Sequence, residues 1–346
     1  MHLRTLWKAT AGVALAASLV AGCSSGTSST GGSGGQVGLD LPRSDSDFWN
    51  AYAKYVPQQA KSLGVNLMSP TDSQNDISKL ASNVQTLVSQ GAKSIVIAPQ
   101  DTGAVIGTLN VLAQKKIPVV SVDTRPDSGK VFMVVRADNK AYGQKACEYL
   151  GQQLKGQGKV VEYEGALSSI NGRERSQAFG DCMKQKYPGI TIYAEPTEWD
   201  GGKAAAALQT VLTQHPDING IYMQAGGVFL APTMQVLKSA GKLIPAGQAG
   251  HITIVSNDGI PQEYQDIKNG DIDATVSQPA DLYAKYALYY AQAALQGKTF
   301  KAGPTDHNST IVQFGDGNLE DQLPAPLVTK SNVNDPNLWG NQIGTS

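Results

Sequence analysis

Short apolar runs alternate with helical stretches along most of the chain, and the apolar runs are rich in β-branched residues. Most of these runs are continuous rather than alternating with polar residues, which is typical of strands that are covered on both faces. We interpret the following runs as strands: 36–41, 65–68, 94–98, 117–122, 131–135, 159–163, 190–194, 218–223, 252–256 and 273–277. Between them, apolar and alanine-rich stretches predict helices at 77–88, 204–214 and 282–297.

Strands that alternate with helices imply parallel, doubly wound sheets, so the chain is predicted to have an α/β fold. The predicted strands are too many for one comfortable sheet, and 346 residues exceed the size at which a single core keeps growing. We therefore expect two lobes, the first from residue 36 to about 138 and the second from there to about 278. The helix at 282–297 fits either lobe. The polar, proline-containing chain beyond residue 315 is predicted to lie on the surface as an extended tail.

The N-terminus has the pattern of a secretory signal. Two basic residues precede an apolar stretch at 9–20, and small residues follow it as far as Cys23. The sequence VAGC at 20–23 resembles a bacterial lipobox, in which the cysteine is lipidated and becomes the new N-terminus. We therefore expect a signal peptide at 1–22, a lipid on the cysteine and a flexible tether of Ser, Thr and Gly from 23 to 35. The alternative is an ordinary signal peptide followed by a chance cysteine.

Two further cysteines fit an exported protein. With Cys23 assigned to a lipid, Cys147 and Cys182 remain, which is an even number in an oxidising compartment. Each lies in a predicted helix of the same half of the chain, and we predict a disulfide bond between them. The alternative is a pair of buried free thiols.

Composition and charge argue against several classes of function. The formal net charge is −1, whereas nucleic-acid-binding proteins usually carry a basic excess. Only four histidines and three cysteines are present, and we expect neither a metal nor another cofactor. The GGSGG sequence at 31–35 fits a hydrolase pattern but lies in the tether, and GKT at 297–299 lacks the glycine that begins a phosphate loop. Because no nucleophile–base pair stands out, we expect a binding protein rather than an enzyme.

Polar and aromatic side chains follow the carboxyl ends of the predicted strands, where open α/β sheets bind their ligands. Carboxylates, amides and arginine bind hydroxyl groups through paired hydrogen bonds, and aromatic faces pack against the C–H face of a sugar ring. This combination is typical of a site for a neutral, polyhydroxylated ligand. Each group also has a structural alternative: Phe48 and Trp49 as helix core, Arg173 and Arg175 as a solvated face, and Asp123 and Asp258 as helix caps or hinge residues.

Several short stretches carry a family resemblance: SDFWN at 46–50, SVD at 121–123, NGRERSQAF at 171–179, NDGIP at 257–261 and ATVSQ at 274–278. With them, the chain from about residue 36 to 340 resembles the type I periplasmic sugar-binding proteins of ABC transporters, in the ribose- and galactose-binding branch. The resemblance implies two Rossmann-like lobes, each a parallel sheet flanked by helices, joined by three crossovers with a ligand in the cleft. The divisions it implies are lobe 1 (36–138 plus about 279–311), lobe 2 (139–278 plus about 312–330) and a C-terminal tail (331–346).

The resemblance also assigns roles to individual residues. Phe48, Trp49 and Trp199 would stack on the sugar, Asp123 and Asp258 would accept its hydroxyls, Arg173 would donate to its oxygens and Gln278 would bind near the third crossover. Further candidates for contact with the ligand are Ser46, Asn50, Asp101, Arg125, Asn171 and Gln224. The family often has asparagine where Ser46 stands, its ribose binders have arginine where Thr124 stands, and its usual Asn-Asp pair is replaced by Ala225-Gly226. Fewer fixed donors leave room for a sugar other than ribose, or for a polyol.

These expectations combine into one function. The chain is expected to be the lipid-anchored substrate-binding component of a bacterial ABC importer, a monomer that closes on a sugar or polyol and docks on membrane permease subunits. It is expected to bind no nucleic acid. One alternative is a sugar- or signal-sensing receptor component on the same fold. Another is a sugar-processing enzyme, which would need Asp123 and Asp258 at catalytic separation.

Overall fold

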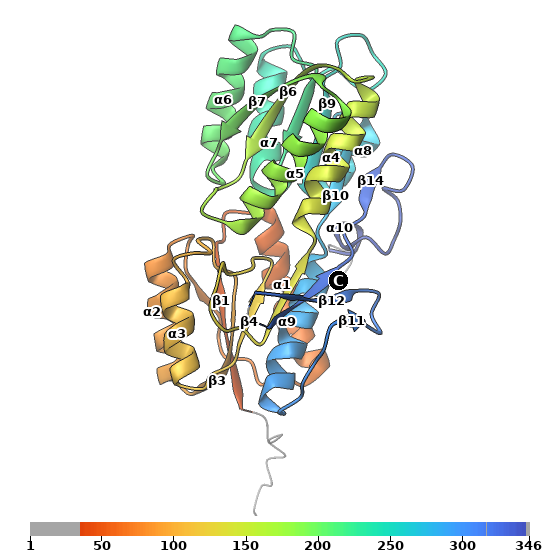
Figure 1. Ribbon diagram of the computed structural model, residues 1–346. Helices are drawn as coiled ribbons and strands as arrows, with labels where there is room; N and C mark the ends of the chain where they lie inside the picture. Colours follow the sequence, from red (N-terminus) through yellow and green to blue (C-terminus); the bar gives the residue numbers. More distant parts are fainter. Residues whose placement is uncertain (1–34, 316, 344–346) are drawn as a thin grey trace, which may run out of the picture. The chain divides into compact units, whose positions relative to one another are not determined.

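The computed structural model describes residues 35–315 and 317–343, in which two β-sheets are each flanked by helices (Figure 1). The strand orders are β11-β12-β13-β5-β4-β3-β1-β2 in the first sheet and β14-β10-β9-β8-β6-β7 in the second. The first sheet contains β1 (Gln36–Leu41), β2 (Thr71–Asp72), β3 (Ala92–Ile97), β4 (Val119–Val122), β5 (Met133–Ala137), β11 (Gly303–Pro304), β12 (Thr310–Phe314) and β13 (Asn318–Leu323). The second contains β6 (Gln157–Glu164), β7 (Gly189–Pro196), β8 (Gly220–Met223), β9 (Thr253–Asp258), β10 (Ala274–Ser277) and β14 (Leu327–Thr329). The strand pairs are parallel except β11 with β12, β12 with β13 and β10 with β14.

Helices cover both faces of each sheet, as the continuous apolar strands predicted. The helices are α1 (Asp47–Leu63), α2 (Ile77–Ser89), α3 (Ile106–Gln114), α4 (Asn139–Gln153), α5 (Ile170–Lys186), α6 (Gly201–Gln214), α7 (Gly226–Ser239), α8 (Pro261–Asn269), α9 (Ala280–Leu295) and α10 (Trp339–Gln342). Successive residues of β6 face opposite cores: Val160 packs in the core that contains Phe179 of α5, and Val161 packs in the core that contains Leu208 of α6. Within the described ranges, none of the helices combines the length and the apolarity needed to cross a bilayer.

The chain crosses between the two lobes three times. It leaves the first lobe between β5 and α4, returns between β10 and α9, and leaves again between β13 and β14. Helix α9 packs against β3, β4 and β5, so the helix predicted at 282–297 belongs to the first lobe. The two-lobed α/β fold predicted from the alternation of strands and helices is confirmed. The predicted signal peptide and Cys23 lie outside the described residues.

The chain beyond residue 315 is not the surface tail that the sequence predicted. Strand β13 pairs in parallel with β5 inside the first sheet, and only β14 joins the second. Residues 312–315 and 317–323, expected in lobe 2, therefore lie in lobe 1, and the third crossover falls at 324–326. A second difference is smaller: the strand predicted at 65–68 is reduced to an isolated bridge between Val37 and Leu67.

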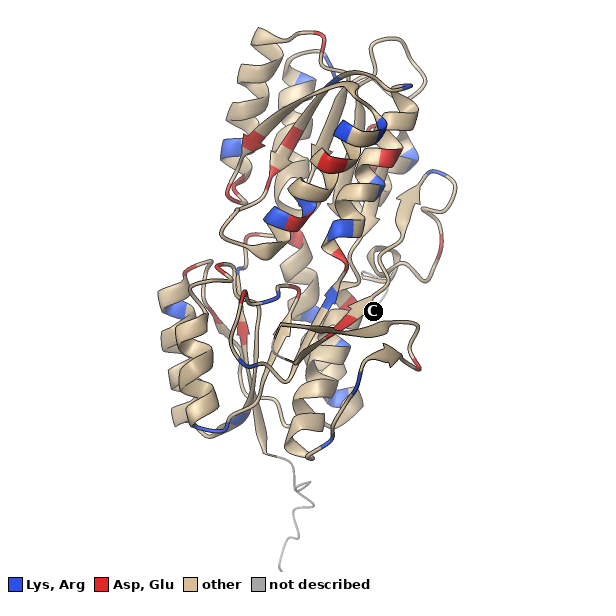
Figure 2. Cartoon of the chain, viewed as in Figure 1, with Lys and Arg blue, Asp and Glu red and all other residues tan. Residues whose placement is uncertain are grey.

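The polar sequence of β13 hides its buried position. Glu320 and Asp321 are fully buried, and each lies near charged or polar residues that are distant in the sequence. Glu320 lies within ion-pair distance of Arg125 and Arg136, at 3.5 and 3.7 Å, and the Tyr290 hydroxyl donates to Asp321 at 3.0 Å. Buried carboxylates are tolerated only with such partners. Elsewhere, Lys and Arg are interspersed with Asp and Glu over both lobes (Figure 2).

The predicted disulfide is present between Cys147 of α4 and Cys182 of α5. Both cysteines are buried, and the two helices pack closely along their length. Gly143 of α4 allows this approach, because a Cβ there would lie 2.3 Å from the Arg175 carbonyl oxygen. The disulfide therefore fixes the position of the helix that carries residues 170–186.

Glu162 is a buried carboxylate in the middle of β6. Its Oε1 accepts a hydrogen bond from Gln224 Nε2 at 2.9 Å, and its side chain lies near the hydroxyl of Ser176. Burial raises the pKa of Glu162 to about 8, although the hydrogen bonds from Gln224 and Ser176 oppose that shift. At neutral pH the second lobe is therefore folded around a protonated glutamate.

Removing the disulfide is expected to destabilise the protein substantially. The bond closes a loop of 35 residues, and restricting the unfolded chain by that amount is worth about 3–4 kcal/mol. We expect Cys147→Ala with Cys182→Ala to lose about that free energy of unfolding, measured by urea denaturation. A reducing agent should have a similar effect on the wild type and none on the double variant. Identical unfolding curves for wild type with and without reductant would contradict this prediction.

Glu162 makes stability depend on pH. In the unfolded chain a glutamate titrates near pH 4.3, so the folded protein holds an extra proton between about pH 4.3 and 8. The contribution of the protonated Glu162 to the stability of the folded protein is fully present below that window and is lost as the pH rises through it. Glu162→Gln keeps the acceptor for Gln224. We expect its free energy of unfolding, measured by urea denaturation, to exceed that of the wild type by about 2–4 kcal/mol at pH 8.5 and by much less at pH 5. The surface change Glu148→Gln is the matched control, and an equal pH dependence in all three proteins would refute the buried-proton account.

Candidate ligand-binding site

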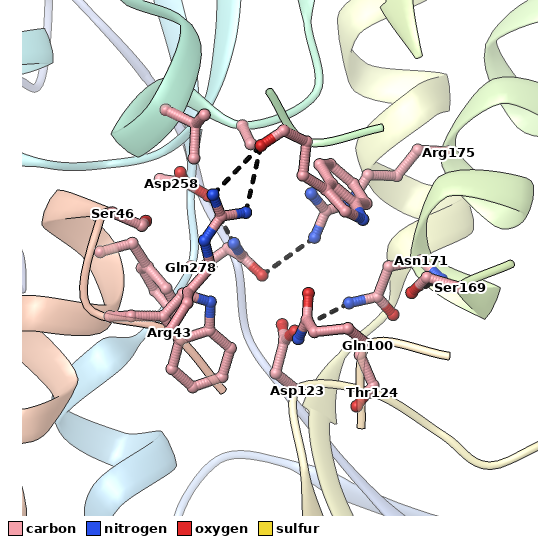
Figure 3. Close-up of a pocket in the computed structure, with 15 residues that line it drawn as sticks. Arg43, Ser46, Gln100, Asp123, Thr124, Ser169, Asn171, Arg175, Asp258 and Gln278 are labelled. Carbon is pink, nitrogen blue, oxygen red and sulfur yellow. Dashed lines mark hydrogen bonds between the residues drawn. The ribbon is translucent and has the colours of Figure 1, made fainter. Parts of the chain in front are cut away.

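A cavity lies between the two lobes, at the carboxyl ends of their strands (Figure 3). Its lining comes from the segments that follow β1, β3 and β4 in the first lobe and β6 to β10 in the second. The lining residues are Arg43, Ser46, Phe48, Trp49, Gln100, Asp123, Thr124, Ser169, Asn171, Arg175, Trp199, Ala225, Val228, Asp258 and Gln278. The convergence of these segments is the one expected of parallel sheets.

Aromatic rings form the walls of the cavity. Phe48 and Trp49 are adjacent in α1, and both are buried, with their ring centroids 5.3 Å apart in an edge-to-face arrangement. Trp199 comes from the second lobe and lies parallel to Phe229, with centroids 6.4 Å apart. A Cβ at Gly165 would lie 2.0 Å from the Trp199 ring, so only glycine leaves space for the indole. The rings thus belong to the core and to the cavity wall at once.

Two buried carboxylates, Asp123 and Asp258, reach the cavity from different lobes. Asp258 accepts hydrogen bonds from Gln278 Nε2 at 2.5 Å and from the Gly227 amide at 2.8 Å. Asp123 Oδ2 accepts one from Asn171 Nδ2 at 2.9 Å, whereas its Oδ1 has no hydrogen-bond partner among the described residues. Burial raises the pKa of Asp123, and it raises that of Asp258 to about 7. Both residues adopt positive φ, 64° and 121°, a strained backbone that is concentrated at functional sites in proteins.

Arg175 is buried, and its positive charge lowers the pKa of both carboxyl groups, against the effect of burial. Its Nε donates to Asn139 Oδ1, its Nη1 to the Gln224 carbonyl oxygen and its Nη2 to Gln278 Oε1. The guanidinium also lies over the rings of Tyr142 and Trp199, at 5.0 and 5.7 Å from their centroids. Three acceptors and two rings therefore fix a positive charge within reach of both aspartates.

Arg173, which the resemblance placed on the ligand, lies outside the cavity. Its guanidinium pairs with Asp127 and donates to Thr102 Oγ1 at 3.2 Å, and a third of its side chain is exposed. Residues two apart in a helix point about 200° from each other, so Arg173 and Arg175 cannot serve the same face. A solvated face was the alternative for both arginines; Arg173 is partly exposed, and Arg175, which was not among the candidates, lines the cavity.

Six of the seven principal candidates line the cavity, with Arg173 the exception, and of the six further candidates only Ser46 and Asn171 do so. Asp101 caps the turn before α3 by accepting from the Ala104 amide at 2.7 Å, and Arg125 is in an ion pair with Glu174. Asn50 is exposed on α1. The Gln224 carbonyl oxygen accepts from Arg175, and its side chain is hydrogen-bonded to Glu162.

Cavity residues outside the candidate set are Arg43, Gln100, Thr124, Ser169, Arg175, Ala225 and Val228. The rule of strand ends points to Gln100 and Thr124, and no local signal marks Arg43.

Arg43 links the lobes at the cavity wall. It is in an ion pair with Asp45 at 2.5 Å, and both of its terminal nitrogens donate to the Trp199 carbonyl oxygen at 3.2 Å. Glu198 and Trp199 both adopt left-handed backbone, with φ of 55° and 57°. The guanidinium of Arg43 donates to the Trp199 carbonyl oxygen and so helps to hold this strained turn, which carries the Trp199 ring.

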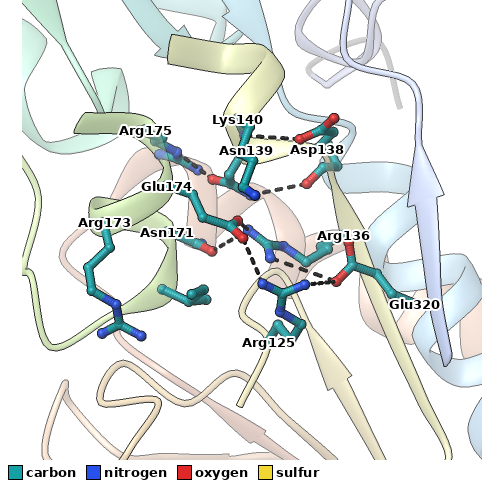
Figure 4. A network of polar contacts seen from close by, with 12 residues as sticks. Arg125, Arg136, Asp138, Asn139, Lys140, Asn171, Arg173, Glu174, Arg175 and Glu320 are labelled. Atoms are coloured by element: carbon teal, nitrogen blue, oxygen red, sulfur yellow. Dashed lines mark hydrogen bonds and ion pairs between the residues drawn. The ribbon is translucent and has the colours of Figure 1, made fainter. Parts of the chain in front are cut away.

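A network of buried charges connects α5 to the first lobe beside the cavity (Figure 4). Glu174 accepts from Arg125 at 2.7 Å and from Arg136 at 2.6 Å. Arg136 also donates to Asn171 Oδ1 at 3.0 Å, and the amide of that asparagine donates to Asp123. Burial lowers the pKa of Arg136, but the carboxylates of Glu320 and Glu174 raise it by more, so the guanidinium stays charged. Through Asn171, the Asp123 carboxylate is thereby linked to the ion pair of Arg136 with Glu174, which joins the two lobes.

Comparison with known proteins agrees with this architecture. Residues 37–299 match the family described as "Periplasmic binding protein domain". The ribose import binding protein RbsB of Salmonella typhimurium is 28% identical over 80% of this chain and 90% of that protein. A xylitol-binding protein of Mycolicibacterium smegmatis is 26% identical over 66% of this chain and 64% of that protein.

The solved structures show the same fold. An ABC transporter solute binding protein from Mycobacterium smegmatis, solved with bound glycerol, is 26% identical and has a TM-score of 0.75. The match covers 87% of this chain and 96% of that chain. With two lobes, three crossovers and a cavity between the strand ends, the chain belongs to the periplasmic binding protein domain family.

Proposed function

We propose that this protein is the lipid-anchored substrate-binding component of a bacterial ABC importer, and that it binds a sugar or sugar-like polyol between its lobes. The observation that carries the proposal is a cavity in which paired carboxylates, a buried arginine and aromatic walls converge from both lobes. The relatives that are named for ribose and xylitol support a ligand of this class. The ligand-binding residues are then Phe48, Trp49, Asp123, Arg175, Trp199, Asp258 and Gln278, with Ser46 and Asn171 beside them.

The charge balance of the cavity favours a neutral ligand. Arg43 is paired with Asp45, and Arg175 faces both Asp123 and Asp258. An added carboxylate or phosphate would meet two desolvated aspartates and no uncompensated cation. A hydroxyl group suits the same surroundings, because it donates to a carboxylate and accepts from a guanidinium.

Unpartnered polar atoms in the cavity wall support the same ligand class. Asp123 Oδ1, Thr124 Oγ1 and Trp199 Nε1 are buried and have no hydrogen-bond partner in the described part of the protein. A buried polar atom without a partner costs about 1–3 kcal/mol. One acceptor and one hydroxyl on the segment after β4 and one donor on the segment after β7 match a ligand that carries several hydroxyl groups. Such a ligand would gain affinity by satisfying all three.

The contacts between the lobes fit a hinged mechanism. The bonds of Arg43 to Trp199 and of Glu174 to Arg136 join different lobes, and we expect them to contribute to the stability of a closed state. A ligand that touches both lobes binds the closed state better and shifts the equilibrium toward it. The apparent dissociation constant equals the intrinsic one divided by the closed fraction, so each contact between the lobes also strengthens ligand binding. The closed form is the species that we propose to dock on the permease.

Substitution of Asp123 separates binding from folding. In Asp123→Asn the Asn171 amide still finds an acceptor, and an NH₂ group replaces the acceptor that faces the cavity. We expect the dissociation constant to rise about 10- to 150-fold, since hydrogen bonds to charged groups are worth about 1.5–3 kcal/mol. The thermal midpoint should be unchanged or higher, because a desolvated carboxylate is removed.

The measurement is thermal unfolding against ribose, xylitol, glycerol, hexoses and inositols, followed by calorimetry with the best compound. At 1,000 times its dissociation constant a ligand stabilises the folded state by about 4 kcal/mol. Asp101→Asn is the matched control, because Asp101 caps a turn outside the cavity. Absence of any shift for the wild type would reject a sugar or polyol ligand, and wild-type affinity in Asp123→Asn would remove Asp123 from the site.

Anchoring depends on Cys23, which lies outside the described residues. The lipobox-like sequence before it supports lipidation, and the Ser, Thr and Gly residues that follow suit a tether. We expect the wild type, expressed in a bacterial host, to fractionate with membranes and to incorporate a labelled fatty acid. Cys23→Ser should release the protein from membranes and abolish labelling, whereas Cys147→Ala with Cys182→Ala should not. Equal membrane association of the wild type and Cys23→Ser would contradict the anchor.

A further inference from the structure

The C-terminal segment, defined as residues 338–343, packs behind the ligand cavity rather than on the open surface. Leu338 and Trp339 in this segment are buried, with Trp339 only 2% exposed. Figure 1 places α10 next to the connections between the lobes. Consistent with this, an open pocket is lined by Trp339 together with Pro279 and Ala325 from two of the crossovers. The segment therefore lies against the hinge.

Trp339 contacts two cavity-lining residues that belong to different lobes. Its indole Nε1 donates to the Asp258 carbonyl oxygen at 3.2 Å, and its ring packs edge-to-face with Phe48, with centroids 6.0 Å apart at 82°. Its own carbonyl oxygen accepts from the Tyr55 hydroxyl at 3.3 Å. Phe48 and Tyr55 are on α1 of the first lobe, and Asp258 ends β9 of the second. Trp339 does not itself line the cavity.

The backbone at Asp258 depends on such support. Its φ of 121° is a conformation that side-chain-bearing residues rarely adopt, and it persists only where neighbours fix it. The Asp258 carbonyl oxygen accepts from the Gln278 amide at 2.9 Å and from Trp339 Nε1. These two donors hold the carbonyl of the same residue whose carboxylate reaches the cavity. The orientation of the carboxylate is thus tied to the indole.

The close packing of the next residue reinforces this tie. A Cβ at Gly340 would lie 2.3 Å from the Gly259 carbonyl oxygen and 2.6 Å from the Tyr264 ring. The segment therefore approaches the Asp258–Gly259 turn at backbone distance, and no side chain fits between them. Movement of the C-terminal segment would therefore move the Asp258–Gly259 turn, and the reverse.

We propose that Trp339 is a positioning residue for the ligand site. It sets the orientation of the Asp258 carboxylate and the Phe48 ring from behind the cavity, so the C-terminal segment controls ligand affinity without touching the ligand. This inference rests on the proposed function for the identity of the ligand class. It assigns to the end of the chain a role that differs from simple core packing.

The test compares the full mature chain with two variants of Trp339 and one control. Trp339→Phe keeps a ring against Phe48 but removes the indole N–H, and Trp339→Leu removes both. We expect the dissociation constant for the best compound of the panel to rise about 3- to 10-fold in Trp339→Phe, the effect of one lost hydrogen bond, and at least 30-fold in Trp339→Leu. Leu80→Ala is the control, because Leu80 is buried in a core that contains no cavity-lining residue. It should lower stability and leave the affinity within twofold.

Amide hydrogen exchange gives a readout that needs no ligand. The Gln278 amide donates to the Asp258 carbonyl oxygen, and the Gly259 amide donates to Glu263 Oε2. Both amides should exchange at least threefold faster in Trp339→Phe, at equal global stability, and should not change in Leu80→Ala.

The outcomes separate the two proposals. Unchanged exchange and unchanged affinity in Trp339→Phe would overturn the positioning role, whether or not Trp339→Leu folds. Faster exchange without any panel compound binding to the wild type would support the structural link and reject the sugar-binding function. Affinity losses that merely follow stability, as judged by an equal loss in Leu80→Ala, would reduce Trp339 to a core residue.

Discussion

Charge buried between the lobes is the constraint on which the rest of the structure depends. Asp123, Asp258, Arg136, Arg175 and Glu174 are all removed from water near the cavity. Each desolvated charge is costly unless a partner is held in good geometry. For several of them the partner comes from the other lobe, as in the pairing of Glu174 with Arg136. The relative placement of the two lobes is therefore determined by electrostatics as well as by apolar packing.

Strained backbone occurs at three residues that line the cavity, as well as at positions elsewhere in the described chain. Asp123, Trp199 and Asp258 all have positive φ. Each strained residue is held through its own main chain: the Asp123 amide donates to Val135, the Trp199 carbonyl accepts from Arg43, and the Asp258 carbonyl accepts from Trp339. Polar side chains can then point into the cavity while their backbones remain fixed. A site preorganised in this way loses little entropy when a ligand binds.

Buried polar residues also explain why one part of this fold could not be predicted from the sequence. Strand β13 has alternating and adjacent polar residues, a pattern that normally marks exposed chain. It is nevertheless paired inside the first sheet, because its carboxylates meet arginines, a tyrosine and a serine from distant segments. A hydrophobic pattern cannot reveal a strand whose stabilisation comes from long-range pairing. Because β13 was not recognised as a strand, the third crossover was predicted near residue 312 instead of at 324–326.

Local spacing determined the architecture of this protein. Continuous β-branched runs, helical periodicity between them and the parity of the cysteines were enough to predict two α/β lobes and the bond between Cys147 and Cys182. The strand-end rule and the family resemblance were enough to place Phe48, Trp49, Asp123, Trp199, Asp258 and Gln278 at one cavity. These features depend on positions that are close in sequence or that end neighbouring strands. They are therefore encoded in patterns that can be read one segment at a time.

Tertiary structure alone decided which polar groups face the cavity and which support it. Arg173 and Arg175 carry the same charge two residues apart, and only the packing of α5 determines that Arg175 faces inward. Arg43 and Trp339 act through carbonyl groups that lie 156 and 81 residues away in the chain. Main-chain carbonyls are identical at every position, so nothing in the sequence marks the ones that will accept a distant donor. The physical reason is that such bonds exist only once the two lobes and the C-terminal segment have come together.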